Sequence, residues 1–417
     1  MQVKLRRTFL WTAAVATLAL AAAACGSSAG ASSASKGPIP TGELLPMSGK
    51  EAFVGQWFDH GTKAGIWDVN HNGGVLGGRQ LTTTLADTAG DPVDAVTAFR
   101  QLMTHNPVVI FGPSSLEIEG VVQDFGASKV VDLMQGGTTQ LDHMQYPYVF
   151  RVYPSDSALL SAEAYYALHT GCTKASLMYT ADANAQAEVP SVVKAFTGHG
   201  GTILDNEQIV AGQSSYLSEV AKAFAKNPQC VFFHADPQTA STLFANIRQL
   251  GHLNVRFITG DTGASIQLAK AMGLAAASKY MTGIASPIAY QPAWNEFVRS
   301  YQAVWNTNKP LPAAPAMYDA VVIAALAMDV AHSTVPSVWV KDVTQVSNPP
   351  GTACYTYATC LALLNKGQKI NYQGASGPED FNQYHNVFSA FDVVQFDPSG
   401  NLKTVFSVTS KNIATMY

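Results

Sequence analysis

The stretch VNHNGGVLGGRQLTTTLAD, residues 69–87, contains a complete change from helix to strand. Residues 52–70 have the pattern of a helix, and residues 80–87 have the alternating, β-branched pattern of a strand. The glycines between Gly73 and Gly78 end the helix and permit a tight reversal, because glycine adopts backbone conformations that other residues avoid. The stretch therefore predicts a helix that returns directly into a strand.

The same alternation continues on both sides of this stretch. Asp91-Pro92 predicts the start of a second helix, since Asp is a favoured cap and Pro suits the first helical position. Residues 290–307 and 313–332 have the pattern of long helices, and the tail from residue 369 is β-like and rich in glycine. Further predicted strands are 41–46, 107–112, 129–134, 175–180, 202–210, 230–235 and 255–260.

Strands that alternate with helices predict an α/β fold with parallel sheets and helices on both faces. More than eight such units over about 390 residues predict two doubly wound sheets rather than one. The chain is expected to leave the first sheet near Tyr148–Pro154 and to return near residues 284–289.

The composition limits the classes of partner. Apolar residues make up 47% of the 417 residues, and charged residues only 13%, about half of the usual share. With 25 Lys and Arg against 29 Asp and Glu, a nucleic-acid partner is not expected. The five cysteines are too few for a disulfide-dense scaffold, and they lack the paired spacing of a zinc site.

Residues 1–24 are predicted to be an export signal. Lys4, Arg6 and Arg7 precede an apolar run of about 13 residues, which is too short to span a bilayer comfortably. The segment Ala22–Cys25 resembles a bacterial lipobox, which predicts lipidation at Cys25, with residues 25–39 as anchor and flexible tether. Two alternatives stay open: ordinary cleavage that leaves a free thiol, and a twin-arginine rather than a Sec signal.

Four groups of residues together resemble a known family. They are Val69–Leu81; Asp87, Gly90-Asp91-Pro92, Ala95 and Gly112–Ser115; Gly136–Thr139 with Tyr146-Pro147 and Phe150-Arg151; and Gly374–Pro378 with Phe381. In this order and spacing they resemble the type I periplasmic solute-binding proteins of the branched-chain amino acid class, over about residues 41–417.

This resemblance implies two α/β lobes joined by three crossover segments, with a solute bound in a cleft that closes by hinge motion. The corresponding division is 40–151 with 287–387 for lobe one, and 152–286 with 388–417 for lobe two. It further implies a lipid-anchored, extracytoplasmic component of an ABC importer, with permease subunits as protein partners, no cofactor and no catalysis. A monomer is expected. A ligand sensor that signals to a membrane partner is the alternative.

In doubly wound sheets a ligand lies beyond the carboxyl ends of the strands, where helix N-termini offer free N–H groups. That rule selects loops in both lobes, and the family's contacts fall in the same loops. Ser115 and Thr138 match the family's donors to a ligand carboxylate; for Ser115 a plain helix cap is the alternative. The candidate ligand-binding residues are Ser48, Ser114, Ser115, Gly136, Thr138, Asn184, His234, Asp236, Asp261 and Thr262.

The lobe-two candidates depart from the family pattern. Asn184 and Asp236 stand where aromatic rings are usual, and Asp236-Pro237 is also typical of a helix cap. Thr262 stands where amino acid binders have the acid for the ligand ammonium, which Asp261 or Asp236 could supply instead. The solute therefore stays open among amino acids, amides, urea-like solutes and organic acids.

Residues 261–265 (DTGAS) match the aspartic protease signature, but such catalysis needs two carboxylates and the chain has a single D-T-G. The motif is better interpreted as a strand end, a loop and a helix start. The histidines show no metal-ligand spacing, and neither a phosphate-cradling loop nor a nucleophile motif is present in the sequence.

The four remaining cysteines are predicted to form two structural disulfides, since export permits them. Cys172 and Cys230 each precede a strand, and these strands are expected to be neighbours; Cys354 and Cys360 are close in sequence. Peptide mapping without reductant is expected to recover the pairs Cys172–Cys230 and Cys354–Cys360. Free thiols or the crossed pairing would contradict this prediction.

Overall fold

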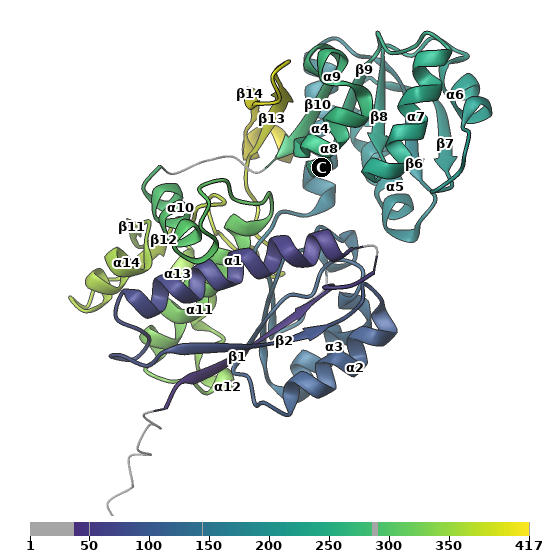
Figure 1. Ribbon diagram of the computed structural model, residues 1–417. Helices are drawn as coiled ribbons and strands as arrows, with labels where there is room; N and C mark the ends of the chain where they lie inside the picture. The colour runs from purple at the N-terminus through teal and green to yellow at the C-terminus, as the bar shows by residue number, and fades with distance from the viewer. Residues whose placement is uncertain (1–36, 50, 144, 286–290, 417) are drawn as a thin grey trace, which may run out of the picture. The chain divides into compact units, whose positions relative to one another are not determined.

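The computed structural model describes residues 37–49, 51–143, 145–285 and 291–416. The first of two large sheets is entirely parallel, with the strand order β2-β1-β3-β4-β5. Its strands β1 and β2 lie side by side in Figure 1. Its strands are β1 (Ile39–Leu45), β2 (Leu81–Asp87), β3 (Val109–Phe111), β4 (Val131–Met134) and β5 (Val149–Arg151). The helices that pack with them are α1 (Ala52–His71), α2 (Pro92–Met103), α3 (Ile118–Ser128), α10 (Gln291–Trp305) and α11 (Ala314–Ala331).

The second sheet has the order β14-β13-β10-β9-β8-β6-β7. Its strands are β6 (Lys174–Thr180), β7 (Thr202–Ile209), β8 (Cys230–His234), β9 (Arg256–Thr259), β10 (Met281–Ala285), β13 (Phe391–Phe396) and β14 (Leu402–Val408). The first five are parallel, whereas β13 runs antiparallel to both β10 and β14. The predicted parallel sheet is confirmed from β6 to β10, and the sequence did not indicate the antiparallel edge, which forms because β13 enters from a crossover and β14 returns by a short turn.

Helices cover the second sheet as the alternation predicts. They are α4 (Asp156–His169), α5 (Ala183–Gly198), α6 (Leu217–Phe224), α7 (Pro237–Gln249), α8 (Ile266–Met272), α9 (Leu274–Tyr280) and α15 (Ser410–Ala414). Two short 3-10 helices, η1 (Thr139–Leu141) and η2 (Asp261–Ala264), follow strands of the two sheets. The chain passes between the sheets after β5, after β10 and before β13. The return near residues 284–289 falls partly outside the described residues, as do the signal segment and Cys25, and the exact lobe boundaries stay predictions.

The glycine-rich reversal after α1 forms as its sequence predicts. Gly74 has a φ of +64°, in the left-handed region that favours glycine, and Val75 pairs with Arg79 across the turn. The Asn70 side chain then binds both backbone groups of Leu81, at 3.0 Å and 2.8 Å, and so fixes the start of β2 to the end of α1. The helix cap at Asp91 is also confirmed, since its carboxylate accepts the N–H groups of Val93 and Asp94.

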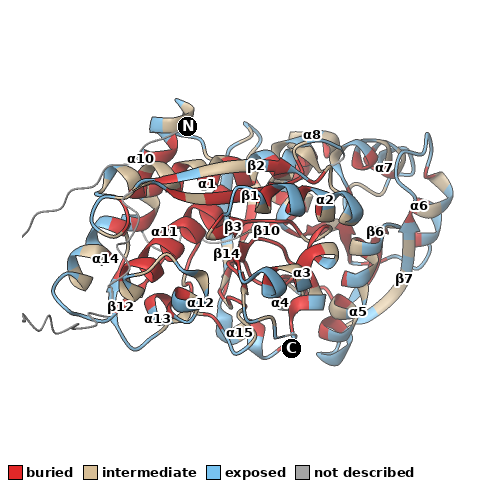
Figure 2. Cartoon of the chain, turned by 90° about the horizontal axis from the view of Figure 1, so that it is seen from below, coloured by how far each residue is buried: buried red, intermediate tan, exposed pale blue. Residues whose placement is uncertain are grey.

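Helix α11 forms the centre of the lobe-one core (Figure 2). Among the described residues it is the one helix with the length and apolarity of a membrane span, but 83% of it is buried inside the fold. Helix α11 therefore has the length and apolarity of a helix in the core of a folded lobe.

The loop after β12 (Ile370–Tyr372) is anchored by Asp319 of α11. Its carboxylate accepts hydrogen bonds from the Tyr372 hydroxyl at 2.6 Å and from the N–H groups of Ala375 and Ser376 at 2.9 and 2.7 Å. Burial raises the pKa of Asp319 to about 6, although these donors oppose the shift. A Cβ atom on Gly374 would lie 2.4 Å from the Asp319 carboxylate, so the close approach requires glycine.

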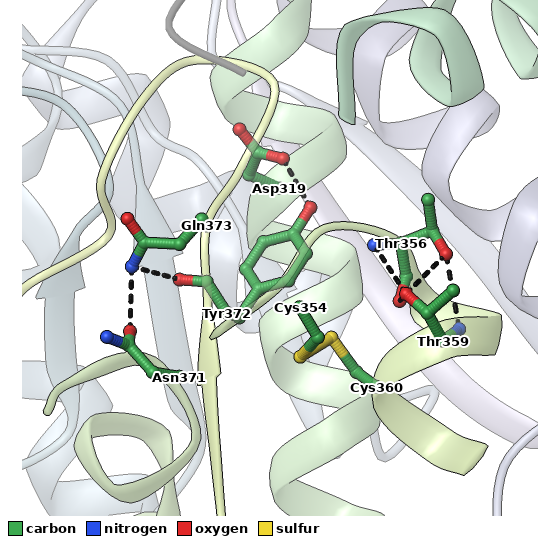
Figure 3. The surroundings of a disulfide bond; sticks show 8 residues. All are labelled: Asp319, Cys354, Thr356, Thr359, Cys360, Asn371, Tyr372 and Gln373. Atoms are coloured by element: carbon green, nitrogen blue, oxygen red, sulfur yellow. Dashed lines mark hydrogen bonds between the residues drawn. A yellow bond between two sulfur atoms is a disulfide. The ribbon is translucent and has the colours of Figure 1, made fainter. Parts of the chain in front are cut away.

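The residues between α11 and this loop form a small unit that the sequence left unassigned. It contains α12 (Pro336–Trp339), α13 (Asp342–Ser347), β11 (Thr352–Cys354) and α14 (Tyr357–Leu364), with β11 paired to β12. A disulfide joins Cys354 to Cys360 at the start of α14, beside the bond from Tyr372 to Asp319 (Figure 3). The second disulfide joins Cys172 to Cys230, and β6 and β8 are neighbours as expected. Both pairs are those that the sequence predicts.

Replacing Asp319 with Ala is expected to lower the free energy of unfolding by about 3 kcal/mol or more, because several buried donors lose their acceptor at once. Urea denaturation of the purified chain measures the change. Asp94→Ala, at an exposed position of α2, is the control and should cost no more than about 1 kcal/mol. Equal effects from the two variants would contradict an anchoring role for Asp319.

Candidate functional site

The lobe-one candidates meet at the carboxyl ends of β3 and β4. The Ser115 Oγ accepts a hydrogen bond from the Thr138 N–H at 3.2 Å, and Thr138 is almost fully buried. A Cβ atom on Gly136 would lie 2.8 Å from the Ser115 Oγ, so the two loops approach as closely as glycine allows. The alternative of a plain helix cap at Ser115 is not what the structure shows, because its side chain bonds the neighbouring loop and not the first turn of α3.

A buried ion pair fixes the position of the loop that contains Thr138. Arg151, at the end of β5, donates to the Thr138 carbonyl at 2.8 Å and to the Asp142 carboxylate at 2.6 Å. The hydroxyl groups of Ser155 and Ser157, at the start of α4, donate to the other Asp142 oxygen at 2.8 Å each. Arg151 and Asp142 are both buried, so the Thr138 loop and the start of α4 share one rigid support.

Two other lobe-one candidates have structural partners. The Ser114 hydroxyl donates to the Glu117 carboxylate, which also accepts from Thr88, so the Ser114 proton is already used. Ser48 is exposed, and its N–H donates to Asp87 at 3.2 Å. Neither the Ser114 nor the Ser48 side chain takes part in the hydrogen bond between Ser115 and Thr138.

The lobe-two candidates follow β6, β8 and β9. Asp236 caps α7 by accepting the N–H groups of Gln238 and Thr239 at 2.9 and 3.0 Å. This is the helix cap that Asp236-Pro237 indicates in the sequence. Asn184 lies half-buried in the first turn of α5. Asp261 is exposed at the start of η2, and Thr262 follows it in the same turn. The DTGAS stretch is thus a strand end, a short turn and the start of α8, capped by Ser265.

His234 lies between two glutamates that the sequence analysis did not single out. Its Nε2 is 2.9 Å from Glu163 of α4, and its Nδ1 is 2.6 Å from Glu188 of α5. Burial alone would lower the pKa of His234, but the two carboxylates outweigh it and raise this pKa well above 6.5. The same Nε2 also lies 3.0 Å from the Gly260 N–H, so Glu163 and the end of β9 both contact this nitrogen.

Two residues near His234, Tyr179 and Asp156, enlarge this group, and Asp156 connects it to lobe one. The Tyr179 ring stacks on the His234 ring at 4.4 Å between centroids. Asp156, in the first turn of α4, donates its N–H to the Gly137 carbonyl at 2.7 Å, and a Cβ on Gly137 would collide with its carboxylate. Burial raises the pKa of Asp156 well above its usual value, and the charges of Glu188 and Asp261 add to the shift.

Sequence reasoning missed Asp142, Asp156, Glu163, Glu188 and Tyr179 because each is unremarkable within its own helix or strand. A weak signal existed for α4, where Asp156 and Glu163 are seven residues apart and so lie on one helical face. Among the described residues, no group of three or more His, Cys, Asp or Glu side chains is placed to hold a metal ion. A hollow of about 10 Å³ between Leu141, Arg151 and Asn386 has room for about one water molecule.

The model of the family described as "Periplasmic binding protein" matches residues 38–401 of this chain. The chain belongs to the periplasmic binding protein family. A leucine-binding protein LivK from Thermotoga maritima has a similar structure, with a TM-score of 0.75 and 17% identity over 90% of this chain and 99% of that one.

Two further relatives of this periplasmic binding protein show how varied their described roles are. An ABC transporter solute-binding protein from R. palustris, solved in complex with benzoate, has a TM-score of 0.71 at 16% identity, covering 89% of this chain and 96% of that one. A chemotactic signal transduction system substrate-binding protein, BasB, from Halobacterium salinarum is 22% identical over 379 residues, 87% of this chain and 88% of its own length. At these identities the two solved structures establish the type I fold of this periplasmic binding protein, which the sequence resemblance implied.

The stability of this periplasmic binding protein is expected to depend on pH through His234. The pKa of the folded ring is raised above 6.5, so its contribution is fully present below pH 6.5 and is lost as the pH rises through the folded pKa. Urea denaturation at about pH 6 and about pH 9 should show a smaller decrease for His234→Gln than for the original chain.

The exposed His105 provides the control for this comparison. His105→Gln should keep the original pH dependence. If His234→Gln and the original chain lost equal stability over the same pH range, the ion-paired state of His234 would be disproved.

Proposed function

We propose that the protein is a lipid-anchored, extracytoplasmic solute-binding component of an ABC importer. Its solute is a small polar organic molecule, an amino acid or a related amide or acid, held at the strand ends of the two lobes. The observation that carries the proposal is the Ser115–Thr138 contact at the carboxyl ends of β3 and β4. The family's role in binding solutes supports it.

The chemistry of that contact suits a carboxylate. The Ser115 oxygen accepts a hydrogen bond from the Thr138 N–H at 3.2 Å, which leaves the Ser115 hydroxyl proton free to donate. The Thr138 hydroxyl oxygen in turn lies 3.5 Å from the Gln140 N–H, and its proton is free in the same way. Two hydroxyl donors on one rigid loop pair can bind both oxygens of a carboxylate.

The crossovers supply the support for a closing motion. The Arg151 N–H donates to the His385 carbonyl at 2.9 Å, and the Val387 N–H donates to the Arg151 carbonyl at 3.1 Å, which joins the first and third crossovers. Two crossover segments joined by backbone hydrogen bonds can act as a hinge, because they can bend while the sheets on either side stay intact. The solute acts by binding the closed state more tightly than the open one, so no bond of the solute needs to change.

The remaining parts of the proposal rest on sequence. Lipidation at Cys25 would place the protein on the outer face of the cell membrane, with residues 25–39 as the tether and permease subunits as partners. We propose a monomer that acts as a binding protein and not as an enzyme.

A second candidate function is ligand sensing. It is favoured by the similarity to BasB, which is described as the substrate-binding protein of a chemotactic signal transduction system. A sensor would use the same solute site but would present its closed state to a signalling partner in place of a permease. Growth or uptake assays on the identified solute, with and without the gene, separate these two functions.

Replacing Thr138 with Ala is expected to weaken binding of a carboxylate-bearing solute by about tenfold or more, because a charged hydrogen bond is lost. The solute is first found by thermal-shift screening of the original chain with amino acids, amides, urea and small acids. Isothermal titration calorimetry then measures the affinity of each variant.

Thr344→Ala is the matched control, since this half-buried threonine lies in α13, within the small unit that follows α11. It should leave the affinity within about twofold of the original. Unchanged affinity in Thr138→Ala would refute the assignment of this site, and a folded protein stabilised by none of the solutes would refute the proposed function.

A further inference from the structure

The group around His234 holds more acidic than basic charge. Four carboxylates act on the ring or on one another, those of Asp156, Glu163, Glu188 and Asp261. They come from α4, from α5 and from the loop after β9, and they face a single imidazolium. The other cation that acts on Asp156 is Arg151, and Arg151 is already paired with Asp142.

Unfilled hydrogen-bonding groups lie within this acidic group. The Tyr179 hydroxyl is fully buried and has no hydrogen-bond partner among the described residues. The Glu163 Oε2 is buried and unpartnered in the same way, and the Glu188 Oε2 lies 2.6 Å from His234 Nδ1 without hydrogen-bond geometry. Buried polar groups in folded proteins normally have partners, so these atoms indicate that a polar group is still to be added.

Tyr179 adds a buried hydroxyl to this group. The ring stacks on His234 from β6, and the charges of Glu163, Glu188 and Asp156 act on the hydroxyl. The unpartnered oxygen can accept a hydrogen bond from a cation, as can the free carboxylate oxygens beside it. An anion at this position would instead face the buried carboxyl groups of Glu163 and Glu188.

We propose that Glu188, Asp261 and Asp156, with the Tyr179 hydroxyl, form a cation subsite in the lobe-two half of the solute site. The inference rests on the proposed function and adds the class of solute: an organic molecule that carries a carboxylate at one end and a guanidinium or amine at the other. His234 is a positioning residue in this subsite, since it ties Glu188 and Glu163 to the end of β8.

The surplus of charge distinguishes this class from a leucine-like solute. His234 lies between Glu163 and Glu188, and both of these carboxyl groups still have an oxygen without a hydrogen bond, as does the Tyr179 hydroxyl, so a single α-ammonium group would leave acceptors unfilled. A guanidinium carries five N–H donors in a fixed plane and can bind two carboxylates at once. A basic solute therefore satisfies more of the unfilled acceptors than a neutral zwitterion does.

Isothermal titration calorimetry on the purified chain compares four probes: L-arginine, agmatine, L-leucine and benzoate. L-arginine is expected to bind most tightly, agmatine more weakly because it lacks the carboxylate, and L-leucine at least about tenfold more weakly than L-arginine. Benzoate is not expected to bind.

If L-leucine or benzoate bound as tightly as L-arginine, the cation subsite would be wrong while the proposed solute-binding function stood. If no probe bound, and the wider screen of amino acids, amides and acids also failed with folded protein, both proposals would fail. These outcomes keep the two proposals separable.

Charge-removing variants locate the subsite. Glu188→Gln and Asp261→Asn are each expected to weaken L-arginine binding by about tenfold or more, and Tyr179→Phe by a smaller factor. Asp342→Asn is the matched control: it removes a buried carboxylate with an unpartnered oxygen from α13, and the affinity should stay within about twofold.

Asp261 is exposed, so Asp261→Asn tests the subsite even if Glu188→Gln destabilises the fold. Circular dichroism and the melting temperature verify that each variant is folded. Retention of L-arginine affinity within twofold in both folded variants would overturn the assignment.

Discussion

The buried ion pair between Arg151 and Asp142 supports the parts of the molecule to which we assign solute binding. Arg151 holds the Thr138 loop through its carbonyl, and Asp142 holds the start of α4 through the hydroxyls of Ser155 and Ser157. Loss of one partner from a buried pair costs about 3–5 kcal/mol, because the other charge is left without compensation. The pair therefore fixes the geometry of the loop and of α4 more than it adds net stability.

The same region joins the two halves of the proposed solute site. Asp156 follows Ser155 directly, and its N–H bonds the Gly137 carbonyl, so the lobe-one loop and the acidic group of lobe two meet at this helix start. The Asn386 side chain of the third crossover donates to the Leu141 carbonyl at 2.9 Å and adds a further tie to the 3-10 turn. In the proposed site, the hydroxyl donors of lobe one and the carboxyl groups of lobe two would give the two ends opposite ligand preferences.

Buried carboxylates recur elsewhere with a different purpose. Asp319 accepts four hydrogen bonds from Tyr372 and the loop after β12, and Asp329 accepts from the Leu76 N–H and the Tyr357 hydroxyl, so both are satisfied within the fold. The group around His234 differs from them because it keeps unpartnered atoms where strand ends and helix starts converge. Position at the strand ends, and not an unpartnered oxygen alone, sets this group apart, since Asp342 of α13 also has a buried oxygen without a partner.

The sequence by itself determined the alternation of strands and helices, the reversal at residues 69–87, the cap at Asp91 and both disulfide pairs. These features depend on local periodicity, on glycine and proline conformation and on strand order, which are all readable along the chain. It also placed Ser115 and Thr138 at adjacent strand ends. Only the tertiary structure decided that Ser114 and Asp236 serve structural partners.

Tertiary structure alone also revealed the group around His234, whose members come from three helices or loops and two strands. Their charges matter because folding buries Glu163 and Glu188 and brings them to 2.9 and 2.6 Å from the ring nitrogens of His234. No local pattern records that proximity. The antiparallel edge formed by β13 and β14 could not be predicted from local patterns either. The direction of a strand depends on where the chain enters the sheet and not on the residues of the strand.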